Sequence, residues 1–319
     1  MKLFALFGLL AGFVTAGTYK DTPGSRDVDV TTNLQRFRLR THSISAPYVD
    51  QELNNRWWDF GGSTIIDANN HIRLTQDKQS ERGWLWSRLP LTVSSYQIEF
   101  EFKVGGKNNH LYGDGFAMWL TQGRNKEGEV FGSVNNFKGL GVFFDTYANS
   151  RHSYPFPRIS AMLGDGETLY DNNKDGDEQS LDGCSIKFRR TEITPKARFS
   201  YLKGNYIKLE LQTKKWGEWE ECFTVEDIEL PLHPYLGFSS ITGEISDNHD
   251  IISVNTNELT KRGTNPRAQA KMNNTKKAKS KSFFRKLVNF VTYTIILALL
   301  GVVAKVFHTA YKQRQAKRF

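Results

Sequence analysis

A run of acidic and amide side chains, DNNKDGDEQSLD from Asp171 to Asp182, has the residue types that bind a hard cation. Asp171, Asn173 and Asp175 occupy the first, third and fifth positions of an EF-hand calcium loop. An EF-hand loop closes with a glutamate, however, where this chain has Asp182. The flanking glycines and alternating apolar residues predict strands and turns instead of helices. These acids are therefore either a solvated loop or ligands of a site completed from elsewhere in the chain.

A second group of oxygen donors lies in FFDTYANS. Asp145, Tyr147 and Asn149 could supply a carboxylate, a backbone carbonyl and a side-chain amide to Ca²⁺. Three ligands are too few for the six to eight oxygens that calcium takes, so a carboxylate from another segment is required. Taken alone, the pattern is also typical of turn residues at the end of a strand.

A third acid, Asp114, lies between two glycines in YGDGFAMWL. Glycines permit unusual backbone angles and the close approach of a ligand. The Asp114 carboxylate could therefore accept hydrogen bonds from sugar hydroxyls, although a tight turn with a solvated acid also fits this motif.

Residues 42–259 have the pattern of an all-β domain that would position these groups. Short alternating segments such as YQIEFEFKV and YIKLELQT are separated by turn clusters such as VGGKNNH. No long stretch has helical periodicity. About 220 residues in one β unit predict two large sheets packed as a sandwich.

Both ends of the chain have the composition of targeting and membrane segments. Residues 1–16 are typical of a secretory signal peptide. Residues 287–307 are almost entirely apolar, and roughly 20 such residues span a bilayer. We therefore expect a single-pass type I membrane protein, with residues 17–41 as an N-terminal segment and residues 308–319 as a cytosolic tail.

The basic residues are concentrated beside the predicted span. Residues 261–319 contain fifteen Lys or Arg and no acids, whereas residues 3–260 contain 27 basic and 34 acidic residues, a net charge of −7. A nucleic-acid partner is therefore not expected. Residues 260–286 predict a flexible luminal stalk that attracts anionic lipid and carries a glycosylation sequon at Asn273. This stalk has no heptads, so we expect a monomer or weak oligomer.

The chain has two cysteines, Cys184 and Cys222. In an oxidising lumen two lone cysteines of one domain usually pair. On the loop-entropy account such a disulfide stabilises the fold by about 3–4 kcal/mol.

Several motifs follow one another along the chain. They are WDFGGST (58–64), GDGFAMW (113–119), FGSVNNFKGLGVFFDTYAN (131–149), residues 171–175, the two cysteines and SDNHDIIS (246–253). Their combination resembles the membrane-anchored legume-type (L-type) lectins of the early secretory pathway, most closely their vesicular integral membrane branch.

The resemblance covers residues 42–259 and extends to the single span and short tail. It implies a concanavalin-like β-sandwich (jelly roll) that binds high-mannose N-glycans with Ca²⁺. It also implies a cargo receptor for glycoproteins in ER–Golgi transport or quality control, located in the endoplasmic reticulum, intermediate compartment and Golgi.

The resemblance also implies residue roles. The calcium ligands would be Asp145, the Tyr147 carbonyl, Asn149 and Asp175, and the mannose contacts would include Ser80, Asp114 and Asn149.

Two further sugar-contacting positions depart from the family pattern. Asn172 replaces a histidine, and Gly243, Glu244 and Ile245 replace Gly-Asp-Leu. A misplaced polar group in a sugar site is costly, so these positions leave the sugar specificity open.

The last three residues, Lys317, Arg318 and Phe319, form a stop-transfer charge cluster with a terminal aromatic. The resemblance implies that they bind COPI and COPII coat components.

Two alternatives to a sugar receptor stay open. One is a degenerate lectin that binds cargo proteins without sugar, consistent with Asn172 and Glu244. The other is a β-sandwich glycoside hydrolase, which needs two carboxylates about 5–10 Å apart. Glu99 and Glu101 have the spacing for such a pair on one strand.

Overall fold

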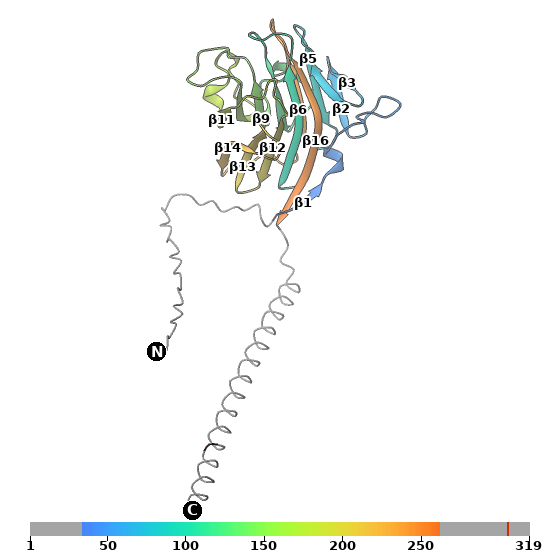
Figure 1. Ribbon diagram of the computed structural model, residues 1–319, viewed down its shortest axis with the longest axis vertical. Coiled ribbons are helices and arrows are strands. Elements are labelled where there is room, and N and C mark those ends of the chain that lie inside the picture. Colours follow the sequence, from blue (N-terminus) through green and yellow to red (C-terminus); the bar gives the residue numbers. More distant parts are fainter. Residues whose placement is uncertain (1–33, 262–304, 306–319) are drawn as a thin grey trace, which may run out of the picture.

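The computed structural model describes residues 34–261 and residue 305, and Figure 1 shows them as two packed β-sheets with strand β16 leading out of the domain. The predicted signal peptide, the Asn273 sequon, the cytosolic tail and nearly all of the stalk and span lie outside these residues. Within the described part of the chain, no helix has the length and apolar character needed to cross a membrane.

The larger sheet has eight strands in the order β14-β13-β12-β6-β16-β4-β3, with β1 paired to β16. Strand β1 pairs with the last residues of β16, so the sandwich begins before the predicted boundary at residue 42. The strands are β1 (Leu34–Arg38), β3 (Ile65–Asp67), β4 (His71–Thr75), β6 (Tyr96–Gly105), β12 (Lys196–Leu202), β13 (Tyr206–Gln212), β14 (Glu220–Glu226) and β16 (Asn248–Lys261).

The smaller sheet has seven strands in the order β11-β10-β9-β7-β15-β5-β2, and the predicted all-β sandwich is confirmed. Its strands are β2 (Trp58–Gly62), β5 (Arg82–Ser87), β7 (Gly115–Thr121), β9 (Lys138–Asp145), β10 (Arg158–Asp165), β11 (Asp182–Ser185) and β15 (Tyr235–Ile241). The remaining elements are β8 (Glu127–Val130) and the short 3₁₀ helices η2 (Arg40–His42), η3 (Asn172–Lys174) and η4 (Asp177–Gln179).

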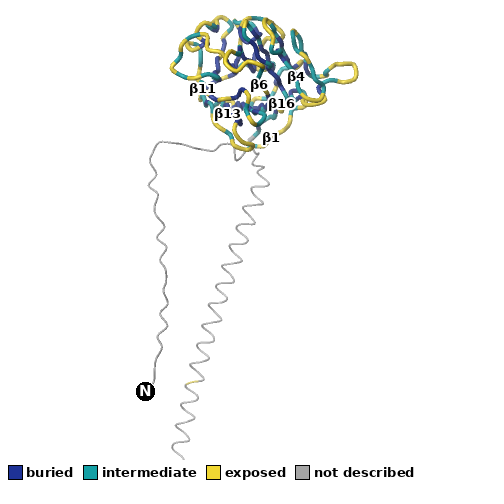
Figure 2. The backbone as a smooth tube through the Cα atoms, turned by 45° about the horizontal axis from the view of Figure 1, so that its top comes forward, coloured by how far each residue is buried: buried dark blue, intermediate teal, exposed yellow. Residues whose placement is uncertain are grey.

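Side-chain alternation explains why the larger sheet has one apolar face. In β6, Ile98, Phe100 and Phe102 are fully buried, whereas Glu99 and Glu101 point away from the core. The Phe100 ring packs against rings of the other sheet, 5.0 Å from Phe238 between centroids. Figure 2 shows that the buried residues gather along the strands in the interior of the domain.

The smaller sheet is covered on both faces, because every residue of β7 is buried. One face belongs to the main core. Loops pack on the other face, where Phe131 and Tyr170 contact Phe143 with ring centroids 5.2 and 4.7 Å apart. This second aromatic cluster fixes the loop that contains Asp175.

Cys184 and Cys222 form a disulfide with Cα atoms 5.1 Å apart, as predicted. Cys184 belongs to β11 and Cys222 to β14, which are edge strands of the two different sheets. The bond therefore links the two layers along one edge of the sandwich.

The two glutamates of the hydrolase alternative belong to a charged ladder on the outer face of the larger sheet. Glu99 pairs with Arg198 at 3.1 Å and Glu101 pairs with Lys196 at 2.6 Å. Both carboxylates therefore have a strand-to-strand structural role.

Candidate functional site

The strand register brings several loops to one end of the smaller sheet. Asp145, the last residue of β9, is paired with Gly115, the first residue of β7. Gly115 is in turn paired with Ile241 at the end of β15, which lies beside Arg82 at the start of β5. The loops that leave these four strand ends therefore open side by side.

Asp175 reaches this end by a different route. Strand β10 runs away from the site, and residues 166–181 then fold back along the sheet. The buried Tyr170 anchors this returning loop against Phe143. As a result the Asp175 carboxylate lies beside Asn149, 26 residues earlier in the chain.

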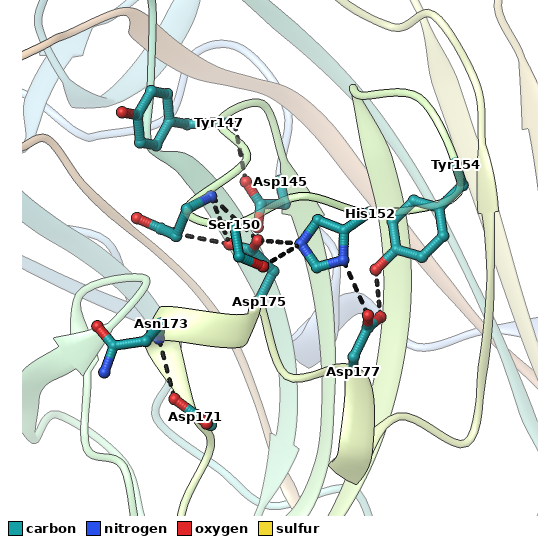
Figure 3. Close-up of polar contacts among 10 residues, drawn as sticks. Asp145, Tyr147, Ser150, His152, Tyr154, Asp171, Asn173, Asp175 and Asp177 are labelled. Atoms are coloured by element: carbon teal, nitrogen blue, oxygen red, sulfur yellow. Dashed lines mark hydrogen bonds and ion pairs between the residues drawn. The ribbon is translucent and has the colours of Figure 1, made fainter.

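Hydrogen bonds link the four predicted calcium ligands in two pairs, and Figure 3 labels Asp145, Tyr147 and Asp175 among them. The Asp145 carboxylate accepts a bond of 2.9 Å from the backbone N–H of Tyr147. The Asp175 carboxylate accepts bonds from the backbone N–H of Asn149 at 3.0 Å and from its side-chain amide at 2.6 Å. The two pairs lie close enough for the charge of Asp175 to act on Asp145, so they form one polar cluster.

Asp145 and Asp175 are both about 94% buried, with 6% of their surface exposed. Burial raises the pKa of Asp145 well above its usual range, and the neighbouring charges of Asp175 and Asp114 raise it further, against the Tyr147 N–H bond that lowers it. The ionised form of Asp145 is therefore costly on its own, and a cation bound beside the carboxylate would stabilise it.

The donor chemistry fits calcium. Among the described residues, no group of three or more His, Cys, Asp or Glu side chains is placed to hold a metal ion by itself. The cluster instead combines two carboxylates with an amide and a backbone carbonyl, which is the oxygen set that a hard cation prefers.

The EF-hand-like spacing of Asp171, Asn173 and Asp175 reflects a turn and does not reflect three calcium ligands. Asp171 accepts a bond of 3.0 Å from the Asn173 N–H, and this turn lies apart from the Asp145–Asp175 cluster in Figure 3. Asp175 and Gly176 then adopt left-handed φ values of 53° and 67°. Asp171 and Asn173 therefore shape the turn that presents Asp175.

His152 belongs to the cluster and was missed by sequence reasoning. Its Nε2 lies 2.6 Å from Asp175 and its Nδ1 lies 2.8 Å from Asp177. Its side chain is only 3% exposed, and Tyr154 donates a further hydrogen bond to Asp177. Burial lowers the pKa of His152, but its bonds to the two carboxylates raise it more. A histidine in SRHSY gave no local signal of these long-range contacts.

The predicted sugar residues lie beside this cluster. The Asp114 carbonyl accepts bonds of 3.0 Å from both the backbone N–H and the hydroxyl of Thr146. A methyl group placed on Gly243 would lie 3.4 Å from the Asp114 carboxylate. One placed on Gly113 would lie 3.1 Å from both Ile245 and Tyr147. Burial raises the pKa of Asp114 to about 6.

The other three predicted sugar residues flank this centre. The Ser80 N–H donates to the Gly243 carbonyl at 3.2 Å, and the Gln79 amide donates to the Glu244 carbonyl at 2.7 Å. The Glu244 side chain is exposed. Asn172 is half-buried, and its carbonyl accepts a 3.5 Å bond from the Asp175 N–H.

Comparison with known proteins shows the family of this domain. The profile of the legume-like lectin family matches residues 35–266. The chain belongs to the legume-like lectin family. The resemblance drawn from the sequence motifs is thereby confirmed.

Two relatives and one solved structure of this lectin family are similar over most of the chain. An L-type lectin-like domain-containing protein of Schizosaccharomyces pombe is 34% identical over 292 residues, 90% of each chain. The vesicular integral-membrane protein VIP36 of Mus musculus is 37% identical over 236 residues, 73% of this chain and 65% of that protein. The crystal structure of the VIP36 exoplasmic/lumenal domain in its Ca²⁺/Man2-bound form has a TM-score of 0.67 at 36% identity, covering 72% of this chain and 93% of that chain.

In this legume-like lectin the predicted calcium and sugar residues gather at one end of the sandwich. That end also contains Asn248, the first residue of β16, whereas Lys261 ends the strand at the opposite end. The candidate site therefore faces away from the point where the described chain leaves the domain (Figure 1).

Proposed function

We propose that this chain is a calcium-dependent lectin that binds high-mannose N-glycans on glycoproteins and acts as a cargo receptor between the endoplasmic reticulum and the Golgi. The observation that carries the proposal is the single cluster formed by Asp145, Asn149 and Asp175 directly beside Asp114 and Gly243. The Ca²⁺/Man2-bound state of the VIP36 domain at 36% identity supports the same ligand class.

Calcium would be held by Asp145, the Tyr147 carbonyl, Asn149 and Asp175. When bound, it supplies positive charge that keeps the buried carboxylates ionised and their segments fixed. Asn149 links the two halves of the site, because its backbone and side chain both donate to Asp175.

The sugar would bind where the Asp114 carboxylate faces Gly243. The ionised Asp114 carboxylate would accept hydrogen bonds from sugar hydroxyls, and the amide of Asn149 would donate to them. The residues around this centre are Ser80, Asn172, Glu244 and Ile245. The missing side chain of Gly243 leaves room above Asp114, since a Cβ there would already be in van der Waals contact with the carboxylate. A preorganised set of this kind binds a sugar without reordering its own loops.

The cellular setting belongs to the same proposal. The relative named as a vesicular integral-membrane protein supports a membrane protein of the secretory pathway. We assign residues 287–307 to the span and the terminal Lys317, Arg318 and Phe319 to coat binding. The protein would act as a monomer or weak oligomer.

Binding of the full-length, detergent-purified chain to a high-mannose glycan array, with calcium and with chelator, tests the proposal. We expect binding that is lost with chelator and in Asp114→Ala. Asp182→Asn is the control, because it removes an exposed acid at the start of β11, outside the cluster. Absence of binding by a folded, disulfide-bonded protein would contradict the glycan-receptor function and favour a lectin fold that binds cargo protein directly.

A further inference from the structure

A basic groove of about 530 Å³ lies on the outer side of the larger sheet, next to the end that carries the candidate sugar site. Strands β4, β6 and β16 form its floor, and residues 76–78 and 105–107 form its rim. Five cationic residues and two acids line it. They are Arg73, Lys78, Lys103, Lys107 and Arg190, with Asp77 and Asp250.

Most of the positive charge in this groove is not neutralised. Arg73 is bound by Asp250 at 2.7 and 2.8 Å. Lys78 and Lys103 form no ion pair with any residue that the structure describes, whereas Lys107 lies near Asp77, whose carboxylate accepts its backbone N–H at 2.7 Å. Arg190 donates to the Asn109 side chain and to the Gly106 carbonyl, which are neutral acceptors.

The groove therefore differs in sign from the domain around it. Its lining has a formal charge of +3, from five cations and two acids. Residues 3–260 together carry −7. Cations that gather in a concave surface of an acidic domain raise the local concentration of an anionic ligand.

One short segment connects the groove to the candidate sugar site. Residues 76–78 line the groove, and Ser80 is a predicted sugar contact. The Asp77 carboxylate accepts a bond of 2.8 Å from the Ser246 hydroxyl, and Gln79 donates to the Glu244 carbonyl at 2.7 Å. Two residues reach at most about 7 Å, so the Cα atoms of Lys78 and Ser80 are no further apart than one or two sugar rings.

We propose that this groove is a subsite for a phosphate group carried by a mannose residue of the bound glycan. The inference rests on the proposed lectin function, because the neutral part of the glycan would occupy the Asp114 site. Neutral sugar hydroxyls are bound by carboxylates and amides, whereas clustered Lys and Arg side chains suit phosphate oxygens through charge-assisted hydrogen bonds. The continuous segment from Lys78 to Ser80 favours one branched ligand across both surfaces over a separate acidic peptide.

Paired glycans test this subsite. The full-length, detergent-purified chain is titrated in calcium with a high-mannose oligosaccharide and with the same oligosaccharide carrying one mannose 6-phosphate. We expect about tenfold tighter binding of the phosphorylated glycan, a factor that a few partly exposed charge pairs give. Raising the salt concentration should reduce this preference.

A triple variant, Lys78→Gln/Lys103→Gln/Arg190→Gln, should lose the preference while it binds the neutral glycan as the wild type does. The control Lys126→Gln/Lys138→Gln/Lys203→Gln removes the same charge from exposed positions outside the groove lining and should keep the preference. Unchanged binding of the neutral glycan also shows that the triple variant is folded.

The outcomes separate the two proposals. Equal binding of both glycans by the wild type, or a preference that persists in the triple variant, overturns the subsite and leaves the lectin function intact. Failure to bind either glycan contradicts both proposals. Binding of the phosphorylated glycan alone, lost in the triple variant, supports the groove and contradicts a neutral high-mannose specificity. Displacement of the phosphorylated glycan by an aspartate-rich peptide at equal concentration overturns the subsite in favour of a protein partner.

Discussion

The Asp175 carboxylate accepts hydrogen bonds from both the backbone N–H and the side-chain amide of Asn149, 26 residues earlier in the chain. The oxygen donors of Asp145, Tyr147 and Asn149 were predictable because they alternate within one motif. The need for a further carboxylate followed from the ligand number of calcium. The resemblance indicated Asp175 as that carboxylate, whereas the spacing alone did not distinguish Asp175 from Asp171. Only the fold shows Asp171 bonded to Asn173 and Asp175 bonded to Asn149.

His152 could not be predicted in the same way, because its contacts depend on the returning loop. It lies within hydrogen-bonding distance of two carboxylates that are 23 and 25 residues away in the chain. Since it is not one of the expected ligands, we assign it the role of positioning Asp175.

Replacing His152 by alanine should weaken calcium binding about tenfold, because groups that orient a metal ligand commonly contribute 10- to 100-fold to affinity. Calcium titration calorimetry measures this effect directly. His233→Asn provides the control, since it removes an exposed imidazole from a loop outside the cluster. Unchanged calcium affinity in His152→Ala would show that Asp175 needs no such support.

His249 predicts a pH dependence of stability. It is fully buried, its Nδ1 lies 2.8 Å from the Thr75 hydroxyl, and its Nε2 has no partner among the described residues. Burial and, to a smaller extent, the charge of Arg189 lower its pKa to about 3. Between pH 6.5 and pH 3 the unfolded chain therefore binds a proton at His249 that the folded domain does not.

The contribution of His249 to the free energy of unfolding should be complete above pH 6.5 and should fall by about 1.4 kcal/mol per pH unit as the pH decreases below it. Denaturant unfolding of the wild type and His249→Gln between pH 7 and pH 4.5 tests this. The difference between the two proteins isolates this group from other titrating residues. Parallel curves would show that His249 does not titrate differently in the two states.

At the scale of elements, the sheets were more predictable than the loops. Alternation in YQIEFEFKV gives β6 one apolar and one polar face, as observed. The burial of β7 on both faces is a tertiary effect, because residues 122–137 and 166–181 cover it. Local patterns do not encode which loop covers which strand, so the route of Asp175 to the site was not predictable.

The turn at Gly176 holds that route in place. Gly176 has a φ of 67°, and a Cβ there would lie 2.1 Å from the ring of the buried Tyr170. Gly166 also has a positive φ, 96°, but a Cβ there would meet no atom closer than 3.7 Å.

Gly166→Ala should therefore cost about 1 kcal/mol of stability from backbone strain alone. Gly176→Ala should cost a further 1–3 kcal/mol from overpacking and should weaken calcium binding. Thermal unfolding of both variants separates the two effects. Equal losses of stability would mean that the Tyr170 ring gives way and does not fix the loop.

In the domain as a whole, the candidate site and the last described residue of β16 lie at opposite ends of the sandwich. Strand β16 runs between them, from Asn248 beside the site loops to Lys261. The Cys184–Cys222 bond holds the two sheets together along one edge. The sequence predicted the sandwich and the disulfide, but it could not predict the basic groove. Lys103, Lys78 and Arg190 come from segments far apart in the chain and become neighbours only through the register of the larger sheet.

We propose that calcium organises one cluster that also binds the sugar. The most direct measurement is the affinity of the full-length chain for a high-mannose oligosaccharide, titrated with saturating calcium and again with chelator. We expect at least about 100-fold tighter binding of the sugar with calcium, together with an equal tightening of calcium binding by the sugar, because linkage is reciprocal. Equal affinity under both conditions, from a folded protein, would contradict it.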